Sequence, residues 1–302
     1  MTQLCALIRR NVKLYFKDKG MFFTSLITPL ILLVLYGTFL GNVYEDSFRS
    51  ALEAAGMTVP DKLIGGCVGG ALASSLLAVC CITVAFCSNF LMVQDRVGGA
   101  RRDLTVSPVG RGTLALGYYI ANLISTLLVC FCAVGLCLIY VSRVGWYLTA
   151  QDVLRILLDV LLLVIFGSAL SSVINVFIRS QGQMSAVGTI VSAGYGFLCG
   201  AYMPISQFSE GLQKAISLLP GTYGTSLLRN HWLGGTFAEM ARQGFPEQVV
   251  EAIKDSMDCN IYFFGSRVET GSMYLVLAGA AAALIAVYVL LNLVHARRKV
   301  RT

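Results

Sequence analysis

Residues 63–93, LIGGCVGGALASSLLAVCCITVAFCSNFLMV, contain no charged side chain and decide the class of fold. A membrane helix needs about 20 consecutive apolar residues to cross the hydrocarbon core of a bilayer, and this run is longer. The extra length indicates a helix that is tilted or that extends beyond the lipid. The run therefore predicts an α-helix that spans a membrane.

The rest of the chain has the same character. Of its 302 residues, 56% are hydrophobic and 13% are charged, and the mean hydropathy is +0.73. A soluble domain carries about 25% charged residues, so lipid must be the solvent for most of this surface. The formal net charge of +7 does not indicate a nucleic-acid partner, because the basic residues cluster at the ends of apolar runs.

Five further apolar runs have the length of a span. With the first run, the predicted spans cover residues 21–40, 63–93, 114–141, 153–178, 184–203 and 272–295. We therefore predict an all-α, polytopic membrane protein with six transmembrane helices, in a membrane domain of residues 21–295.

Basic residues set the orientation of these spans. They gather before the first span, between the second and third, and after the sixth, whereas the segments after the first and fifth spans are more acidic than basic. Basic segments stay on the cytoplasmic side of a membrane. Both termini are thus predicted to be cytoplasmic, with residues 296–302 as a basic tail.

The first 20 residues form a segment of their own. At 100° per residue, four basic side chains fall on one narrow face and apolar side chains cover the other. The basic residues are Arg9, Arg10, Lys13 and Lys17. The pattern is typical of an amphipathic helix that lies along the membrane surface. We predict such an interfacial helix over residues 1–20; a merely basic, solvated tail is the alternative.

Residues 94–113, QDRVGGARRDLTVSPVGRGT, connect the second and third predicted spans. The Gly98-Gly99 pair can end the preceding helix, residues 100–105 can form a short helix, and Ser107-Pro108 can end it. A compact polar helix here can serve as a docking surface. It can equally be an ordinary turn whose arginines only set topology, and spacing alone does not separate the two.

The pattern changes after the fifth span. Pro204 ends that span, one amphipathic helix follows, Pro220-Gly221 makes a sharp turn, and a second short amphipathic helix comes next. Each arm is too short to cross, so we predict a re-entrant helical hairpin over residues 204–235 that dips into the outer leaflet before the last span. Residues 236–271 are predicted to form an extracellular cap.

No motif for chemistry occurs in the chain. It lacks the phosphate loop G-x-x-x-x-G-K-[ST], the metalloprotease motif H-E-x-x-H and the hydrolase motif G-x-S-x-G. Most of the cysteines lie inside apolar runs and are expected to be ordinary membrane side chains. Cys67 and Cys259 lie nearer the outer side, and their pairing stays open. We predict a chain that is no enzyme and holds no cofactor or metal.

Charged residues inside a span are costly in lipid and therefore informative. Arg155 and Asp159 are four residues apart in the fourth span, so they can pair on one helix face. An interfacial ion pair is the favoured interpretation, and a proton relay is the alternative. The two histidines, His231 and His295, are isolated in the sequence and predicted to be interfacial.

Two motifs carry a family resemblance. The first has the pattern D-R-x-x-G-x-x-x-x-L-x-x-S-P-x-x-R, and the second lies in the hairpin. Their residues are Asp95, Arg96, Gly99, Leu104, Ser107, Pro108 and Arg111, and then Pro204, Leu219, Pro220, Tyr223 and Arg229. Together with the order of the parts, over essentially the whole chain, they resemble the type-2 family of ABC exporter permeases. The long acidic segment 236–271 departs from the usual family pattern.

The resemblance implies a role for each part. Residues 95–111, with Arg101 and Arg102, would contain the coupling helix that sits in a cleft of an ATPase subunit, and two such subunits would bind ATP and Mg. The hairpin would line the outer gate. A second permease copy or a paralogue would complete the pathway, lined by the second and fifth spans. Candidate lining residues are Asn89, Tyr195, Phe197 and Tyr202.

The resemblance further implies a multi-pass protein of the bacterial cytoplasmic (inner) membrane that exports its cargo by alternating access. The apolar spans favour a drug-like or lipid-like amphiphile over a glycan, since a sugar path would need more aromatic platforms. The alternative is a secondary transporter driven by an ion gradient. That class predicts broken helices in both halves of the chain, and only one broken region appears.

Overall fold

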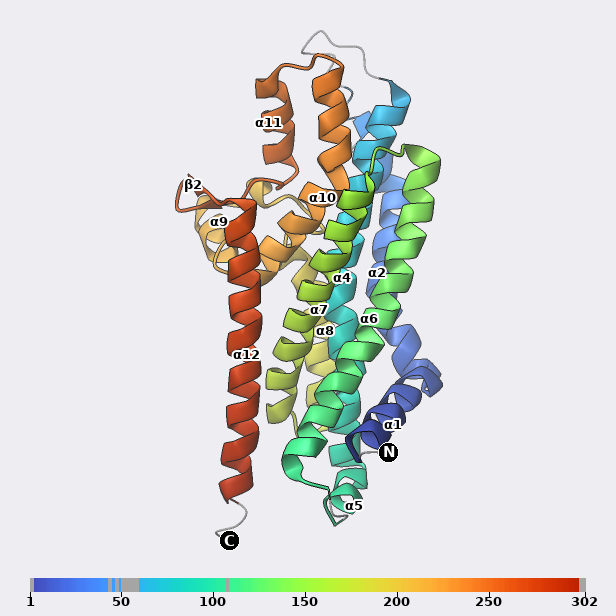
Figure 1. The fold of residues 1–302 in the computed structure, drawn as a ribbon, viewed down its shortest axis with the longest axis vertical. Helices are drawn as coiled ribbons and strands as arrows, with labels where there is room; N and C mark the ends of the chain where they lie inside the picture. The colour runs from blue at the N-terminus through green and yellow to red at the C-terminus, as the bar shows by residue number, and fades with distance from the viewer. Residues whose placement is uncertain (1–2, 43–44, 47–48, 50–59, 107–108, 299–302) are drawn as a thin grey trace.

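The computed structural model describes residues 3–42, 45–46, 49, 60–106 and 109–298, which form an elongated helical bundle (Figure 1). Its helices are α1 (Gln3–Lys17), α2 (Lys19–Leu35), the π-helical turn η1 (Tyr36–Leu40), α4 (Asp61–Val97), α5 (Ala100–Val106), α6 (Arg111–Val144), α7 (Ala150–Phe177), α8 (Gln181–Leu198), η2 (Ile205–Gln207), α9 (Glu210–Ile216), α10 (Pro220–Arg242), α11 (Glu247–Ser256) and α12 (Thr270–Arg298). Strands β1 (Tyr262–Phe263) and β2 (Ser266–Arg267) form a small antiparallel hairpin.

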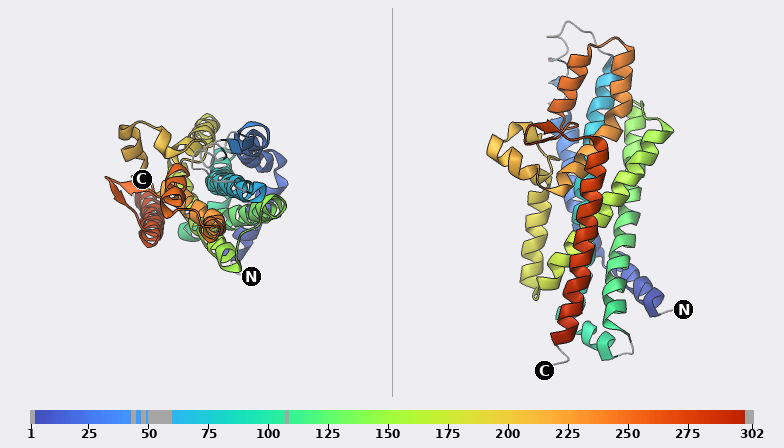
Figure 2. Two further views of the ribbon diagram at one scale, coloured as in Figure 1. Left: turned by 90° about the horizontal axis from the view of Figure 1, so that it is seen from above. Right: turned by 60° about the vertical axis from the view of Figure 1, so that its left-hand side comes forward.

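Helix α4 is the centre of the bundle and contains the run that decides the fold. Its most apolar stretch is completely buried, because α2, α6, α7, α8 and α10 all pack against it (Figure 2, left). Small residues allow this crowding: a Cβ at Gly70 would lie 2.7 Å from Leu233 Cδ2 of α10. Close helix approach through glycine is typical of membrane bundles.

Four of the six predicted spans are confirmed by length and composition in the described part of the chain. They are α4, α6, α7 and α12; α1 and α2, bent by 70° at their junction, could count as one more. Helix α2 has only 17 residues before η1, and α8 contains polar residues such as Gln181 and Gln183. The first and fifth spans are helical where expected, but their crossing of the bilayer remains a prediction.

The N-terminal amphipathic helix is present as α1. It ends at Lys17, and the Asp18 side chain caps α2 by accepting a hydrogen bond of 3.0 Å from the Met21 N–H. Leu7, Asn11 and Tyr15 of α1 are buried against the bundle. The predicted boundary near residue 20 therefore lies within two or three residues of the observed bend.

The hairpin prediction needs correction. Helix α9 is short, as expected, but α10 continues from Pro220 to Arg242 and crosses the predicted boundary at residues 235–236. Gly235 lies inside the continuous helix, and a Cβ there would collide with the Tyr147 carbonyl of the α6–α7 loop. That glycine allows close packing. Helix α8 also ends at Leu198, before Gly200 (φ +73°), rather than at Pro204.

The end of the bundle opposite the two termini contains a second apolar cluster (Figure 1). Residues of α4, α10 and α11 build it, and Cys67 and Cys259 are both buried there as free thiols. Residues 236–271, the predicted cap, contain helix α11 and the β1–β2 hairpin, and the hairpin was not predicted. Two strands of two residues are too short to leave a periodic pattern in the sequence.

Candidate functional site

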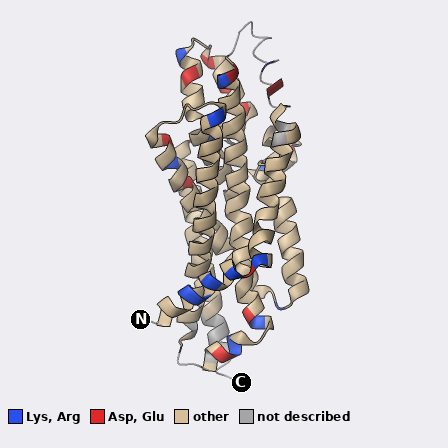
Figure 3. Cartoon of the chain, turned by 90° about the vertical axis from the view of Figure 1, so that its right-hand side faces the viewer, with Lys and Arg blue, Asp and Glu red and all other residues tan. Residues whose placement is uncertain are grey.

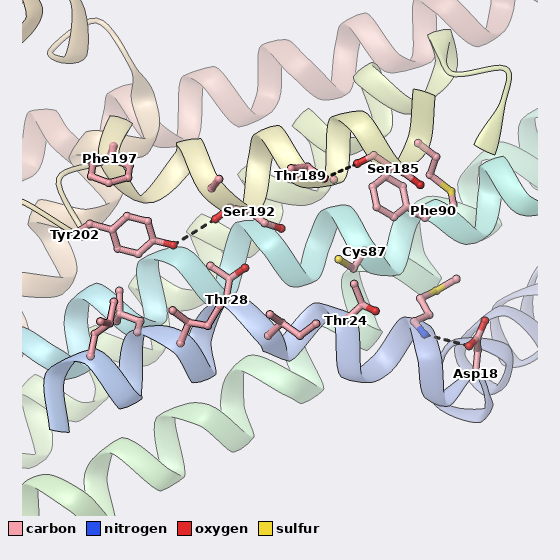
Figure 4. Close-up of a pocket in the computed structure, with 18 of the residues that line it drawn as sticks. Asp18, Thr24, Thr28, Cys87, Phe90, Ser185, Thr189, Ser192, Phe197 and Tyr202 are labelled. Carbon is pink, nitrogen blue, oxygen red and sulfur yellow. Dashed lines mark hydrogen bonds between the residues drawn. The ribbon is translucent and has the colours of Figure 1, made fainter. Parts of the chain in front are cut away.

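A large groove runs along one side of the bundle between α2 and α8, with α4 as its floor (Figure 4). Its volume is about 1050 Å³. Its lining residues are Asp18, Met21, Thr24, Ile27, Thr28, Ile31, Leu32, Leu35, Tyr36, Cys87, Phe90, Gln94, Met184, Ser185, Gly188, Thr189, Ser192, Ala193, Phe197, Tyr202 and Met203. Ile27 and Ile31 remain half-exposed, so the groove is open along its side.

The lining is apolar with a sparse set of hydroxyl groups. Thr24 and Thr28 come from α2, and Ser185, Thr189 and Ser192 come from α8 (Figure 4). The Asp18 carboxylate, at one end, already accepts the Met21 N–H. Such a surface suits a ligand that is mostly apolar and offers a few hydrogen-bonding groups.

The four predicted pathway residues separate into two groups. Phe197 and Tyr202 line the groove, with ring centroids 5.1 Å apart in an edge-to-face arrangement. The Tyr195 hydroxyl is buried and points toward Gly221 of α10. Asn89 donates to Ser171 and Ser172 of α7 at 3.1 and 2.9 Å, so it joins two helices outside the groove.

Asp95 lies in the last turn of α4 and attaches two other helices to it. Its carboxylate accepts two hydrogen bonds from Arg10 of α1, at 2.7 and 3.1 Å, and one of 2.5 Å from the Tyr118 hydroxyl of α6. Asp95 is buried, and Arg10 is about one-third exposed. This residue therefore fixes the amphipathic helix to the bundle.

Arg96 contacts the end of a different helix. Its Nη1 lies 3.2, 3.0 and 2.6 Å from the carbonyl oxygens of Asn175, Val176 and Ile178, at the C-terminus of α7. These carbonyls have no partner within the helix, and a cation there is favourable. Arg96 thus joins α4 to α7.

The short helix expected over residues 100–105 is present as α5. Helix α4 ends at Val97, and Gly99 takes the left-handed conformation (φ +88°) that starts the turn. Leu104 of α5 packs against a small cluster that includes Leu7 of α1 and Tyr118 of α6. Arg111 begins α6, while Ser107 and Pro108 lie outside the described residues.

Helices α1, α5 and the C-terminal end of α4 are therefore one connected unit. We expect Arg10→Ala to destabilise the protein by about 1–3 kcal/mol, because the buried Asp95 carboxylate loses its charged donor. Thermal unfolding in lipid nanodiscs would measure this, with Arg9→Ala at the exposed neighbouring position as control. Equal unfolding temperatures for the two variants would contradict the assignment.

The hairpin residues are placed in several contacts. Pro204 precedes η2, Leu219 precedes α10, and Pro220 is the first residue of α10. The Tyr223 hydroxyl donates to the Ser217 carbonyl at 2.6 Å and so closes the turn between α9 and α10.

Arg229 is buried at the junction of three segments. It pairs with Asp258 at 2.9 Å and donates to the Gly200 carbonyl beyond the end of α8. Asp258 in turn accepts the Ile205 N–H at 2.7 Å and has left-handed backbone geometry (φ 52°). The pair connects α10 to the loop after α11 and to the turn after α8.

The structure contains a buried polar cluster between α7, α10 and α12 that the sequence analysis did not predict. His231 Nδ1 lies 2.6 Å from Asp159, whose other carboxylate oxygen accepts the Tyr274 hydroxyl at 2.5 Å. The sequence interpretation paired Asp159 with Arg155 and treated His231 as isolated and interfacial, and the structure instead buries His231 against Asp159. The carboxylate of Asp159 within a predicted span is the sequence signal that indicates such a cluster. The sequence does not show its partner, because His231 lies 72 residues away along the chain.

Comparison with known families identifies one match. A family model described as ABC-2 type transporter matches residues 2–231, which include the groove, α5 and the first half of α10. A comparison with functionally curated proteins finds no match.

Proposed function

The chain belongs to the ABC-2 type transporter family, and from that premise we propose that it is the permease subunit of an ABC exporter. It moves an amphiphilic molecule, drug-like or lipid-like, outward by alternating access. ATP hydrolysis on separate ATPase subunits drives the cycle; those subunits bind ATP and Mg, and this chain binds neither.

The groove between α2 and α8 is the observation that carries this proposal. Its volume of about 1050 Å³ is at the upper end of ordinary ligand sites. A wall of Ile27, Ile31 and Phe197 with scattered hydroxyls matches a molecule with an apolar body and a small polar group. Two aromatic rings at one end, Phe197 and Tyr202, are few for a glycan path.

The groove is open on one side, which supports a pathway shared by two chains. We propose that a second permease, either a copy or a paralogue, covers the open side and that cargo passes between the two. The outward- and inward-facing states then bind cargo with different affinities, as coupled transport requires. Tyr223, Pro220 and the turn between α8 and η2 form the outer gate in this proposal.

The charge distribution supports the proposed topology. Lys and Arg line α1 at the end of the bundle where both termini lie, and acidic residues gather mainly at the opposite end (Figures 1 and 3). By the positive-inside rule the α1 and α5 end faces the cytoplasm. With α2 and α8 as additional spans, six helices cross the bacterial cytoplasmic membrane.

Helix α5 is the proposed contact with the ATPase. It carries Arg101 and Arg102, and Leu104 packs it against residues of α1, α4 and α6. A movement of the ATPase would therefore reach α4, the floor of the groove, through packed side chains.

One observation favours the secondary-transporter alternative. The buried Asp159–His231–Tyr274 cluster contains two groups that can bind protons inside the outer half of the bundle. Buried ionisable residues of this kind mark proton pathways in some membrane transporters. The cluster does not line the groove, so the ABC permease remains the preferred proposal.

The deciding experiment measures complex formation and ATPase activity in nanodiscs after co-expression with the ATPase encoded beside the gene. We expect Arg101→Glu/Arg102→Glu to lose cargo-stimulated hydrolysis or the complex itself, because charge reversal opposes docking. Arg242→Glu, an exposed position at the opposite end, is the matched control and should behave as wild type. If no ATPase co-purifies and the isolated chain moves solute down an ion gradient, the alternative replaces the proposal.

A further inference from the structure

The β1–β2 hairpin presents an exposed aromatic tip. Tyr262 and Phe263 are 47% and 41% exposed, and Phe264 in the turn is 64% exposed. The two phenylalanine rings contact each other edge to face, with centroids 4.9 Å apart. Exposing three neighbouring aromatic side chains to water is unfavourable. The tip is therefore expected to contact an apolar surface.

The turn itself favours a different residue at the most exposed position. Phe264 (φ 48°) and Gly265 (φ 89°) both have left-handed backbone geometry. Asn or Gly is preferred at such a position, and a bulky side chain there is strained. The sequence thus has an exposed aromatic ring where a polar residue would suit both the backbone and the solvent.

Polar contacts hold the base of the hairpin while the tip projects. Arg267 pairs with Glu251 of α11 at 3.0 Å, and the Tyr262 hydroxyl donates to Asp255 at 3.0 Å. A hydrogen bond from Lys254 lowers the pKa of Glu251, which therefore stays ionised at neutral pH. The hairpin is consequently an oriented projection from the cap.

The position of the hairpin identifies its neighbour. Helix α12 begins at Thr270, three residues after β2, and Leu275 in its second turn is 75% exposed. The hairpin projects sideways from the bundle at the level where α12 begins, beside α9 (Figure 1). From above, it lies on the α12 side of the molecule, far from α2 (Figure 2, left).

We propose that residues 262–265 insert into the outer leaflet at the level of the lipid headgroups and hold the cap at a fixed height on the membrane. Aromatic side chains are enriched at this depth, where the rings meet both apolar chains and polar groups. The lipid surface is continuous with the lipid-facing side of α12. The proposal depends on the chain being a membrane subunit and not on its cargo or ATPase.

Tryptophan fluorescence tests the insertion directly. Phe264→Trp would be made in a Trp146→Phe background, which leaves the fully buried Trp232 as a constant signal. In nanodiscs we expect its emission to be blue-shifted and quenched most by lipids brominated near the headgroup. Gln243→Trp, on the exposed turn after α10, is the control and should emit as in water and resist lipid quenching.

Equal quenching of both variants by acrylamide, with no lipid quenching of Phe264→Trp, would overturn the proposal. A blue shift without lipid quenching would overturn it too, since it would indicate a protein neighbour such as a second copy.

A second variant separates anchoring from folding. Phe263→Ser/Phe264→Asn relieves the backbone, so its unfolding temperature in detergent should not fall below that of wild type. Transfer from detergent to nanodiscs should stabilise this variant less than wild type, because the lipid contact is missing. If the transfer to nanodiscs raised the unfolding temperature of the variant and of the wild type by the same amount, the hairpin would not be a lipid anchor.

Discussion

Replacing Arg229 with methionine should destabilise the protein around α10 and α11 by about 3–5 kcal/mol, the usual effect of removing one partner of a buried ion pair. Arg229 and Asp258 are 6% and 5% exposed, so the remaining carboxylate would be buried without its cation. The Gly200 carbonyl and the turn after α8 would lose their donor as well. The expected observation is a large fall in unfolding temperature in nanodiscs.

The double variant Arg229→Met/Asp258→Asn makes the test specific. Without the unpaired charge, it should be more stable than Arg229→Met alone, although asparagine can still accept the Ile205 N–H. Arg242→Ala is the control for loss of an arginine, because its contact to Glu239 is 3.7 Å long and exposed. If Arg229→Met unfolds at the wild-type temperature, the pair does not hold the outer segments together.

Filling the groove should abolish transport without unfolding the protein. Thr189 lies on α8, lines the groove and is exposed, so tryptophan there needs no repacking. We expect Thr189→Trp to reduce cargo transport to background and to remove the cargo-stimulated part of ATP hydrolysis. Basal hydrolysis should remain, because α1 and α5 are untouched.

The control for groove filling is Leu290→Trp on an exposed face of α12, where the side chain is 59% exposed. It adds the same ring outside the groove and should transport as wild type. Unchanged transport by Thr189→Trp would show that cargo takes another route, while loss of basal hydrolysis as well would indicate a general assembly defect.

Most of the helical segments were predictable because their signals are local. An uncharged run of the length of residues 63–93 can satisfy its backbone in lipid only as a helix, whatever its neighbours are. The same holds for α6, α7 and α12, and Gly98-Gly99 correctly ended α4. The end predicted for the hairpin at residue 235 was wrong, because α10 continues to Arg242 and Gly235 lies inside it, in close contact with Tyr147.

The candidate site was only partly predictable. Phe197 and Tyr202 could be assigned to a pathway because they are aromatic residues near the end of a predicted span. Tyr195 has the same signal but turns toward α10, and the polar Asn89 turns toward α7. Helix α2, which supplies much of the groove, was not assigned to the pathway. A helix presents several faces, and its sequence alone does not show which one meets a neighbour.

The sequence by itself determined that this chain resides in a membrane, where most of its long apolar helices begin and end to within a few residues, and which end carries the basic charge. These properties depend on hydropathy, glycine and proline positions, and charge, all of which act over short stretches of chain. Only the tertiary structure decided the partners of the buried charges. Arg10 meets Asp95 across 85 positions and His231 meets Asp159 across 72, because helix packing selects the faces that touch.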